Sequence, residues 1–256
     1  MARVQDKVVL ISGGASGLGL ASARRLAAEG ATVILADIDA DAGEAAAATV
    51  TGASFKPLDV TDEAQWQALI SDIEAEYGRL DVLLNSAGIV RLASIEDTTE
   101  EIWRLVNAVG TDGTYYGCKH ALALMKKAGS GSIINMCSTA SIQGMPGIFA
   151  YAASKSAIRG MTKSIACLSA QEGYGVRCNS LHPGNMDTPM LEGVREQVSK
   201  SRPDAVAAMD KLWMGEPLDV ANMVLFLASD ESRAVNGAEL VIDNTTTITE
   251  GTVPRH

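Results

Sequence analysis

The chain has 256 residues, of which 47% are hydrophobic, so it is long enough to bury a large core in one globular unit. Its net charge is -10 and it contains no run of lysine and arginine, which argues against a nucleic-acid or anionic-membrane partner. No apolar run approaches the roughly 20 residues that span a bilayer, and no leader-like segment is recognisable, so we expect a cytoplasmic protein. The four cysteines and three histidines show no ligand spacing, so we expect no metal site.

Short apolar runs alternate with amphipathic stretches along the chain. We expect strands at 7–11, 32–36, 54–58, 82–84, 131–135, 176–181 and 239–242. We expect helices at 19–29, 63–77, 100–127, 151–171 and 219–228. Strict alternation implies parallel strands joined by right-handed crossovers. The sequence therefore predicts an α/β fold, a single domain over residues 1–256 with a Rossmann-type doubly wound parallel sheet and helices on both faces.

A glycine-rich turn follows the first predicted strand and opens the first predicted helix. Gly13, Gly17 and Gly19 let the backbone approach a pyrophosphate, and the start of the helix offers free N–H groups and a positive dipole end. Because the turn stands between a strand and a helix, we expect it to bind a dinucleotide.

Acidic residues at the ends of the next two strands bear on the choice of cofactor. Asp37 closes the second strand, where a carboxylate can bond the adenosine ribose hydroxyls. Its charge repels a 2′-phosphate, and neither Ser16 nor Ile38 offers a cation, so we expect NAD and not NADP. Asp59, at the end of the third strand, could reach the adenine edge or could instead cap the next helix.

Tyr151 and Lys155 stand four residues apart in a helical segment that follows Ser138. Residues at i and i+4 share one helix face, so the lysine ammonium can lie beside the phenol. A free tyrosine titrates near pH ~10, and a cation about 4 Å away contributes roughly 4 kcal/mol, so we expect the Tyr151 pKa to fall by about 3 units. Near pH 7 such a phenol can take or return an alcohol proton.

Several motifs then occur in the order found in one known family. Residues 12–19 resemble its cofactor turn, and residues 85–88 resemble its Asn-Asn-Ala-Gly motif. Asn107 is similar to its helical asparagine, residues 182–188 to its Pro-Gly loop, and the serine, tyrosine and lysine above to its active-site trio. From almost end to end, the chain resembles the short-chain dehydrogenase/reductase family.

The resemblance implies a role for each motif. It implies that Tyr151 is the acid/base, that Lys155 lowers its pKa and holds the nicotinamide ribose, and that Ser138 hydrogen-bonds the substrate oxygen. It implies that Asn107 anchors a water linking the lysine to solvent. The expected NAD contacts are Gly13, Ser16, Gly17, Leu18, Gly19, Asp37, Ile38, Asp59, Val60, Asn85, Ala87, Gly88, Tyr151, Lys155, Pro183, Gly184, Met186 and Thr188.

A few positions depart from the family pattern. Ser12 replaces the usual threonine and Ser86 replaces an asparagine, but both keep a polar group. Asp243-Asn244-Thr245 stands where Asp-Gly-Gly is common. The loss of two glycines stiffens this turn and could reshape the substrate mouth or a subunit contact.

The substrate side is predicted from apolar residues around the carboxyl edge of the sheet. Residues 190–214 contain no strand, so we expect a substrate lid there, with a surface helical excursion as the alternative. The residues expected to face the substrate are Val90, Ser138, Ile142, Met145, Ile148, Tyr151, Met190, Met209 and Trp213. Apolar walls suit a bulky hydrophobic alcohol better than a sugar or a charged acid, although each apolar side chain could instead pack in the core.

We therefore expect an NAD-dependent oxidoreductase for a hydroxysteroid or a cyclic or aryl secondary alcohol, since residues 181–190 resemble bacterial dehydrogenases for such substrates. Two other functions stay open. A 3-oxoacyl-thioester reductase using NADPH is disfavoured by Asp37 and the negative charge, and a non-catalytic dinucleotide sensor is disfavoured by the complete trio. The family resemblance also implies a homotetramer, or else a dimer, that pairs helices 100–127 and 151–171.

Overall fold

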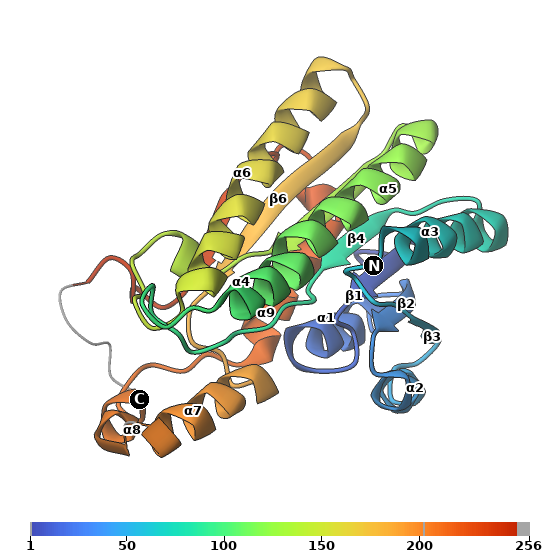
Figure 1. The fold of residues 1–256 in the computed structure, drawn as a ribbon. Coiled ribbons are helices and arrows are strands. Elements are labelled where there is room, and N and C mark those ends of the chain that lie inside the picture. The colour runs from blue at the N-terminus through green and yellow to red at the C-terminus, as the bar shows by residue number, and fades with distance from the viewer. Residues whose placement is uncertain (1, 202, 250–256) are drawn as a thin grey trace.

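The computed structural model describes residues 2–201 and 203–249 of the chain. Its strands are β1 (Val8–Ser12), β2 (Thr32–Asp37), β3 (Ser54–Pro57), β4 (Val82–Asn85), β5 (Gly131–Met136), β6 (Val176–Pro183) and β7 (Glu239–Ile242). They form one parallel sheet in the order β3-β2-β1-β4-β5-β6-β7 (Figure 1). The predicted doubly wound sheet is confirmed. The strand order reverses between β1 and β4, which is where such a sheet leaves a crevice for a ligand.

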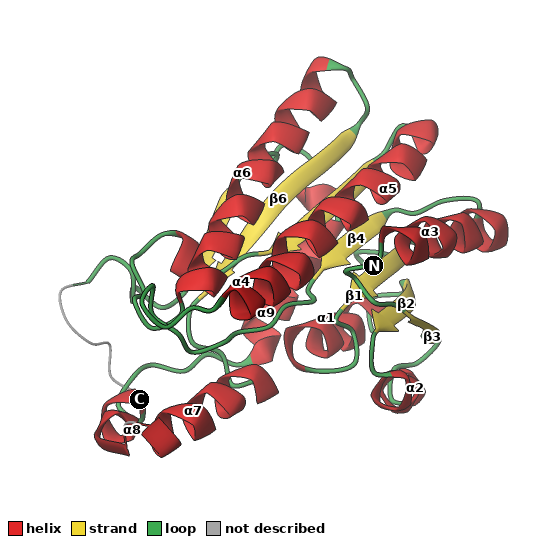
Figure 2. Cartoon of the chain, in the orientation of Figure 1, coloured by secondary structure: helices red, strands yellow, loops and turns green. Residues whose placement is uncertain are grey.

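Helices cover both faces of this sheet (Figure 2). One face carries α1 (Gly17–Ala27), α2 (Ala40–Ala48) and α9 (Pro217–Ala228), and the other carries α3 (Glu63–Tyr77), α5 (Gly113–Ala128) and α6 (Phe149–Gln171). The remaining helices are α4 (Glu100–Asn107), α7 (Pro189–Ser201) and α8 (Pro203–Met209), with short turns at Ala108–Asp112, Thr139–Ser141 and Asp230–Ser232. Within the described ranges, no helix is long and apolar enough to cross a membrane.

Successive residues of each strand point to opposite faces, so the strands supply two cores. In β1, Val9 and Ile11 pack in the core under α1 and α9, whereas Val8 and Leu10 pack in the core under α3 and α5. Burial on both faces explains why central strands such as β1 and β4 read as continuous apolar runs in the sequence, whereas the edge strands β3 and β7 are only partly buried.

Several helical details differ from the sequence prediction. The alanine-rich helix α2 was not predicted, because its segment lacks an apolar stripe at helical spacing. The segment 100–127 is not one helix: a π-helical turn at Ala108–Asp112 separates α4 from α5. The expected lid segment 190–214 consists mainly of α7 and α8, and residue 202 between them lies outside the described part of the chain.

Candidate active site

A cavity of about 620 Å³ opens at the carboxyl ends of the strands. The glycine turn and the ends of β2 and β3 form one part of its wall, and the start of α6 and the helices α7 and α8 form another. The predicted residues that line it are Gly13, Ser16, Gly17, Leu18, Asp37, Ile38, Asp59, Val60, Ala87, Gly88, Val90, Ser138, Met145, Ile148, Tyr151, Lys155, Pro183, Gly184, Met186, Thr188, Met190 and Met209. One continuous hollow therefore brings together most of the residues predicted for cofactor and substrate.

The glycine turn has a tightly packed backbone that leaves no room for side chains at Gly13 and Gly19. Gly13 has a φ of 67°, and a Cβ at this position would lie 2.7 Å from the backbone of Ala87. A Cβ on Gly19 would overlap the carbonyl oxygen of Gly13. Helix α1 begins at Gly17, its N-cap Ser16 makes no side-chain capping bond, and its first turn has no acidic residue. The open N–H groups at the positive end of α1 therefore fit the diphosphate of a dinucleotide.

Two carboxylates border the same part of the cavity. The Asp37 carboxylate accepts hydrogen bonds from the backbone N–H of Ala15 at 3.1 Å and of Asp39 at 3.2 Å. Asp59 accepts from the backbone N–H of Thr61 at 2.9 Å and from its hydroxyl at 2.7 Å. Asp62, and not Asp59, caps helix α3, so the alternative reading of Asp59 as the helix cap is wrong.

Ser138, Tyr151 and Lys155 all line the cavity. Ser138 follows β5, and its hydroxyl oxygen accepts from the backbone N–H of Ala140 at 3.1 Å. Tyr151 and Lys155 lie in the first two turns of α6, and the lysine Nζ lies 5.5 Å from the centroid of the tyrosine ring. Lys155 Nζ donates a hydrogen bond to the carbonyl oxygen of Met136 at 2.7 Å.

The structure corrects the expected pKa of the phenol. Burial raises the pKa of Tyr151 to about 12, and a hydrogen bond with Ser138 offsets only part of that rise. Tyr151 keeps some exposure on the cavity side, but the protein packed around it disfavours the phenolate. Burial also lowers the pKa of Lys155. The prediction of a pKa lowered by about 3 units assumed an ammonium close to the phenol oxygen, whereas this ammonium is directed at a backbone carbonyl.

Two predicted polar residues lie outside the cavity. Asn85 is 3% exposed, and its amide donates to the side-chain oxygen of Asn135 at 2.9 Å, so it links β4 to β5. Asn107 ends α4 beside the π-helical turn, where its amide donates to the carbonyl of Trp103 at 2.9 Å and its oxygen accepts from Thr111 at 3.1 Å. Both side chains bond other parts of the protein and do not face the hollow.

Three predicted residues of other kinds also lie outside it. Gly19 is buried beneath the glycine turn, where it permits close packing of helix and turn. Ile142 is 39% exposed and borders no part of the cavity. Trp213 packs against the core under α9 and lines a separate hollow formed with the C-terminal turn around Asp243.

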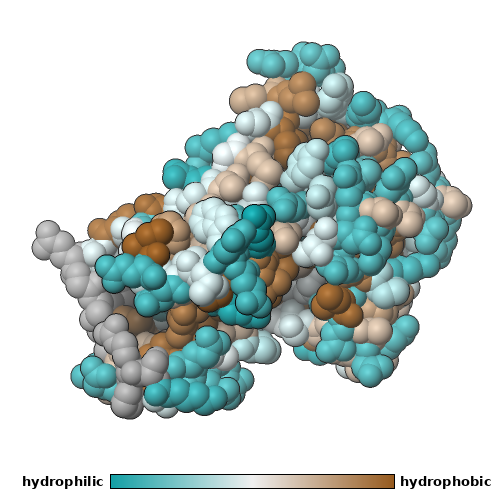
Figure 3. Space-filling view, in the orientation of Figure 1, coloured by the Kyte–Doolittle hydropathy of each residue, from teal (hydrophilic) through white to brown (hydrophobic). Residues whose placement is uncertain are grey.

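The end of the cavity where α7 and α8 supply part of the wall is mostly apolar. An ion pair of 2.7 Å between Arg195 and Asp210 ties α7 to the end of α8. Figure 3 shows the surface hollowed between these helices and the part of the chain that carries α1 and α2. The lining residues that the sequence reading did not name individually include Arg91, Leu105, Val109, Leu191 and Val194. Val194 lies one helical turn after Met190, a spacing that could have identified it.

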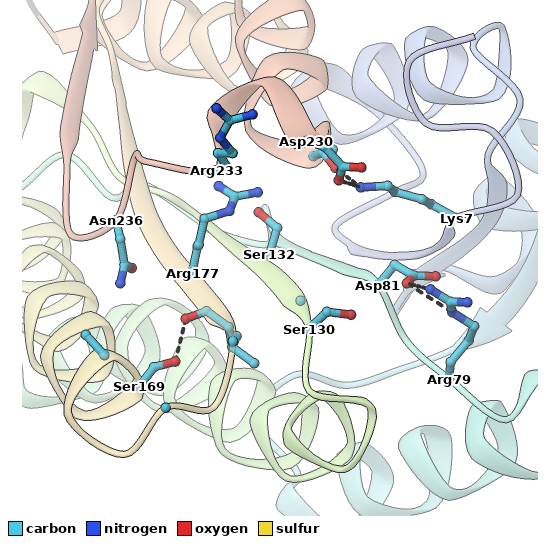
Figure 4. Close-up of a pocket in the computed structure, with 16 residues that line it drawn as sticks. Lys7, Arg79, Asp81, Ser130, Ser132, Ser169, Arg177, Asp230, Arg233 and Asn236 are labelled. Carbon is cyan, nitrogen blue, oxygen red and sulfur yellow. Dashed lines mark hydrogen bonds and ion pairs between the residues drawn. The ribbon is translucent and has the colours of Figure 1, made fainter.

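A larger hollow of about 820 Å³ lies at the opposite end of the sheet and contains no predicted site residue (Figure 4). Most of its charged groups bond one another or the backbone: Lys7 pairs with Asp230 at 2.6 Å and Arg79 pairs with Asp81. Arg177 donates to the carbonyl of Leu227 at 2.7 Å, near the end of α9. The wall of this hollow is therefore mostly a hydrogen-bonded polar surface, and its size alone does not make it the active site. Among the described residues there is no cluster that could hold a metal ion.

Comparison with known proteins agrees with this geometry. A family model described as enoyl-(acyl carrier protein) reductase matches residues 13–247. The chain is 40% identical over 250 residues to cyclopentanol dehydrogenase of Comamonas, covering 95% of this chain and 98% of that one. It is 40% identical over 245 residues to 3-alpha-(or 20-beta)-hydroxysteroid dehydrogenase of Mycobacterium tuberculosis, covering 95% and 90%.

A further relative and a solved structure extend the comparison. The NADP-dependent (R)-specific alcohol dehydrogenase of Lentilactobacillus kefiri is 40% identical over 248 residues, covering 94% of this chain and 96% of that one. The crystal structure of levodione reductase superimposes with a TM-score of 0.92 at 33% identity, covering 97% of this chain and all of the other. The fold, the family model and the relatives agree, and the chain belongs to the short-chain dehydrogenase/reductase family of oxidoreductases.

Proposed function

We propose that this protein interconverts a bulky hydrophobic secondary alcohol and its ketone, with NAD(H) as the hydride carrier and Tyr151 as the acid/base. The observation that carries the proposal is the single cavity that joins the glycine turn, Asp37 and the trio to apolar walls. When bound, the dinucleotide supplies the nicotinamide carbon that accepts or returns hydride. Gly13, Gly17 and the N-terminus of α1 would hold its diphosphate, and Lys155 would hold the nicotinamide ribose.

The residues of the chain orient the alcohol and move its proton. Ser138 offers a hydroxyl to the substrate oxygen, and Tyr151 exchanges the proton with that oxygen. With a pKa of about 12, Tyr151 is protonated at neutral pH, which is the state that gives a proton to a ketone. Removing a proton from an alcohol needs the phenolate, which the positive charges of Lys155 and of an oxidised nicotinamide favour.

Asp37 supports NAD as the cofactor. Its carboxylate borders the cavity and is held by two backbone N–H groups, so it can bond ribose hydroxyls and repel a 2′-phosphate. Ile38 beside it is 71% exposed and offers no cation to such a phosphate. We expect kcat/KM to favour NAD over NADP by about tenfold or more, and Asp37→Ala to erase most of that preference. A wild-type preference for NADP would show that this reading of Asp37 is wrong.

The substrate class rests on the apolar end of the cavity and on the relatives, whose names include cyclopentanol and hydroxysteroid dehydrogenases. The test is a panel of cyclopentanol, cyclohexanol, 1-phenylethanol, and 3-hydroxy and 17-hydroxy steroids, with NAD and NADP in separate series. Formation of reduced nicotinamide is followed by absorbance. Turnover of one ring class with NAD supports the proposal, whereas reduction of an acetoacetyl thioester by NADPH alone would favour a thioester reductase.

Substitution of the acid/base separates an enzyme from a dinucleotide sensor. We expect Tyr151→Phe to lose about 100-fold or more in kcat, because the proton has no acceptor, while NADH binding measured by fluorescence is retained. Tyr77→Phe, at the end of α3 and outside the cavity, is the control and should keep wild-type turnover. Full turnover by Tyr151→Phe would remove the tyrosine from the mechanism. A wild type that binds NADH but turns over no member of the panel would favour the sensor.

We also propose that residues 190–214 act as a substrate lid and that the protein assembles as a homotetramer. Met190 and Met209 reach the cavity from α7 and α8, which supports the lid. Large hydrophobic side chains on α4, α5 and α6 remain exposed, with Trp103 at 40%, Tyr115 at 46% and Leu168 at 44%, and burial of these faces between subunits supports assembly. Light scattering after gel filtration distinguishes a tetramer from a dimer or a monomer.

A further inference from the structure

His182 is a buried titratable residue that the proposed chemistry does not use. It lies near the end of β6, just before the Pro-Gly loop, and is 0% exposed. Burial lowers its pKa, so the ring is neutral at pH 7. His182 belongs to no group of three metal-ligating side chains among the described residues, and it does not line the cavity, so the geometry supports neither a metal-ligand nor a direct acid/base role.

The ring of His182 has a polar partner at each nitrogen. Nδ1 lies 3.0 Å from the hydroxyl of Ser141 and 3.2 Å from the carbonyl oxygen of Ser138. Nε2 lies 2.8 Å from the hydroxyl of Ser180. A carbonyl oxygen can only accept, and the Ser141 hydroxyl already donates to that carbonyl at 2.7 Å. The Ser180 hydroxyl lies 2.8 Å from Nε2 and 3.4 Å from the carbonyl oxygen of Ala238, so Nε2 is its nearer partner. These contacts favour a ring proton on Nδ1, with Nε2 accepting from Ser180.

The contact between His182 Nδ1 and the carbonyl oxygen of Ser138 constrains the backbone just beyond the end of β5, where the hydrogen bonds of the sheet stop. Strand β5 ends at Met136, and the N–H of Cys137 still bonds the carbonyl of Leu181 at 2.8 Å. Ser138 then begins a short turn, so its carbonyl is held by groups of that turn and by the histidine ring. The position of the Ser138 hydroxyl, which also bonds the backbone N–H of Ala140, depends on the same turn.

We propose that His182 is a positioning residue: its Nδ1–H fixes the carbonyl of Ser138 and the hydroxyl of Ser141, and so aims the Ser138 hydroxyl at the substrate oxygen beside Tyr151. A shift of about 1 Å in such a group can lower a rate about 100-fold. The glycine turn, Asp37 and Asp59, which would hold the diphosphate and adenosine, lie on other strands, whereas Pro183 and Gly184 of the expected nicotinamide contacts follow this ring directly. Loss of the ring should therefore change kcat more than the Kd for NADH.

Two amide substitutions separate positioning from simple packing. In His182→Asn the side-chain amide can take the place of Nδ1, whereas in His182→Gln it reaches the place of Nε2. We expect His182→Asn to keep kcat within about threefold, and His182→Gln to lose about 10- to 100-fold in kcat with a change of less than about threefold in the Kd for NADH. Ser180→Ala, which removes only the Nε2 partner, should keep kcat within about twofold.

Equal losses in the Asn and Gln variants, or a full kcat in His182→Gln, would overturn the proposal. If His182→Gln does not fold, Ser141→Ala against Ser180→Ala makes the same comparison, and equal kcat values in that pair would overturn the proposal.

This proposal about His182 rests on the proposed alcohol chemistry. A second measurement, of the ring tautomer, is therefore chosen so that it does not depend on turnover. Nitrogen NMR of the wild type should show His182 protonated at Nδ1 and bare at Nε2, with the signal assigned by its loss in His182→Asn. The opposite tautomer would refute the contact with Ser138 even in an active enzyme. If the wild type turns over no alcohol, the proposed function fails and the NMR result alone decides whether the ring holds this turn.

Discussion

Glu239 offers the clearest electrostatic prediction about stability. It begins β7 and accepts an ion pair from Arg159 Nε at 2.8 Å and from Lys163 Nζ at 2.5 Å, both on α6, the helix that carries the tyrosine and lysine of the trio. The Arg159 hydrogen bond is the main reason that the pKa of Glu239 falls from 4.5 to about 2. We therefore expect Glu239→Gln to weaken the attachment of α6 to the sheet edge.

The magnitude follows from the linkage between proton binding and folding. A fall from 4.5 to about 2 corresponds to at most about 3 kcal/mol. The Arg159 and Lys163 side chains are 38% and 53% exposed, so solvent screens the attraction and we expect about 1 to 2 kcal/mol. Because the folded pKa is depressed, this stability is present above pH 4.5 and is lost as the pH falls through about 2.

The assay is urea unfolding of the wild type and Glu239→Gln at fixed protein concentration from pH 7 down to pH 3, followed by tryptophan fluorescence. We expect the difference in unfolding free energy to shrink steadily below pH 4.5. Glu100→Gln is the matched control, because its ion pair with Arg104 joins two side chains that are each 75% exposed and should change stability by about 0.5 kcal/mol or less. A difference that stays constant down to pH 3, or equals that of the control, would refute the reasoning.

Three further outcomes are expected. Because the pKa of Tyr151 is about 12, the tyrosinate absorbance of wild type and Tyr151→Phe should coincide up to pH 10, and an excess in the wild type below that pH would contradict the burial argument. Gly19→Ala should lower the unfolding free energy by about 1 to 3 kcal/mol and weaken NADH binding, because its Cβ would overlap the Gly13 carbonyl; unchanged values by denaturation and fluorescence titration would contradict this. Thr245 is exposed with a φ of 72°, so Thr245→Gly should raise the urea midpoint by relieving about 0.5 to 1 kcal/mol, whereas a lower midpoint would show that the threonine is not strained.

Sequence periodicity predicted the strand positions well because the central strands, such as β1 and β4, are buried on both faces and read as apolar runs. Sequence periodicity did not predict the structure where tertiary contacts determine the backbone conformation. The π-helical turn at Ala108–Asp112 places the hydroxyl of Thr111 3.1 Å from that of Ser154 on α6, a contact between distant segments that no local pattern reports. Helix α2 packs its alanines on the sheet without an apolar stripe, so periodicity did not reveal it.

The candidate site could be predicted as a set of residues but not as an electrostatic environment. The spacing of Tyr151 and Lys155 places them on one helix face, and both line the cavity. The direction of the ammonium depends on the carbonyl of Met136 at the end of β5, which is not evident from that spacing. The contacts of His182 were not predictable from the sequence either, because its partners Ser138 and Ser141 lie about forty residues earlier in the chain.

The pKa values of Tyr151 and Lys155 are shifted in opposite directions, and together they keep the phenol protonated at neutral pH. Burial disfavours the charged form of each group, so it raises the pKa of Tyr151 and lowers the pKa of Lys155. Lys155 keeps a polar partner in the carbonyl of Met136, so its charge is tolerated without a carboxylate nearby. The phenol has a hydrogen bond with Ser138, and positive charge added to the cavity, such as an oxidised nicotinamide under the proposed function, would favour its phenolate form. Under the proposed function, the placement of the Ser138 hydroxyl would bear directly on the proton transfer, and so would the buried contacts of His182 beneath that serine.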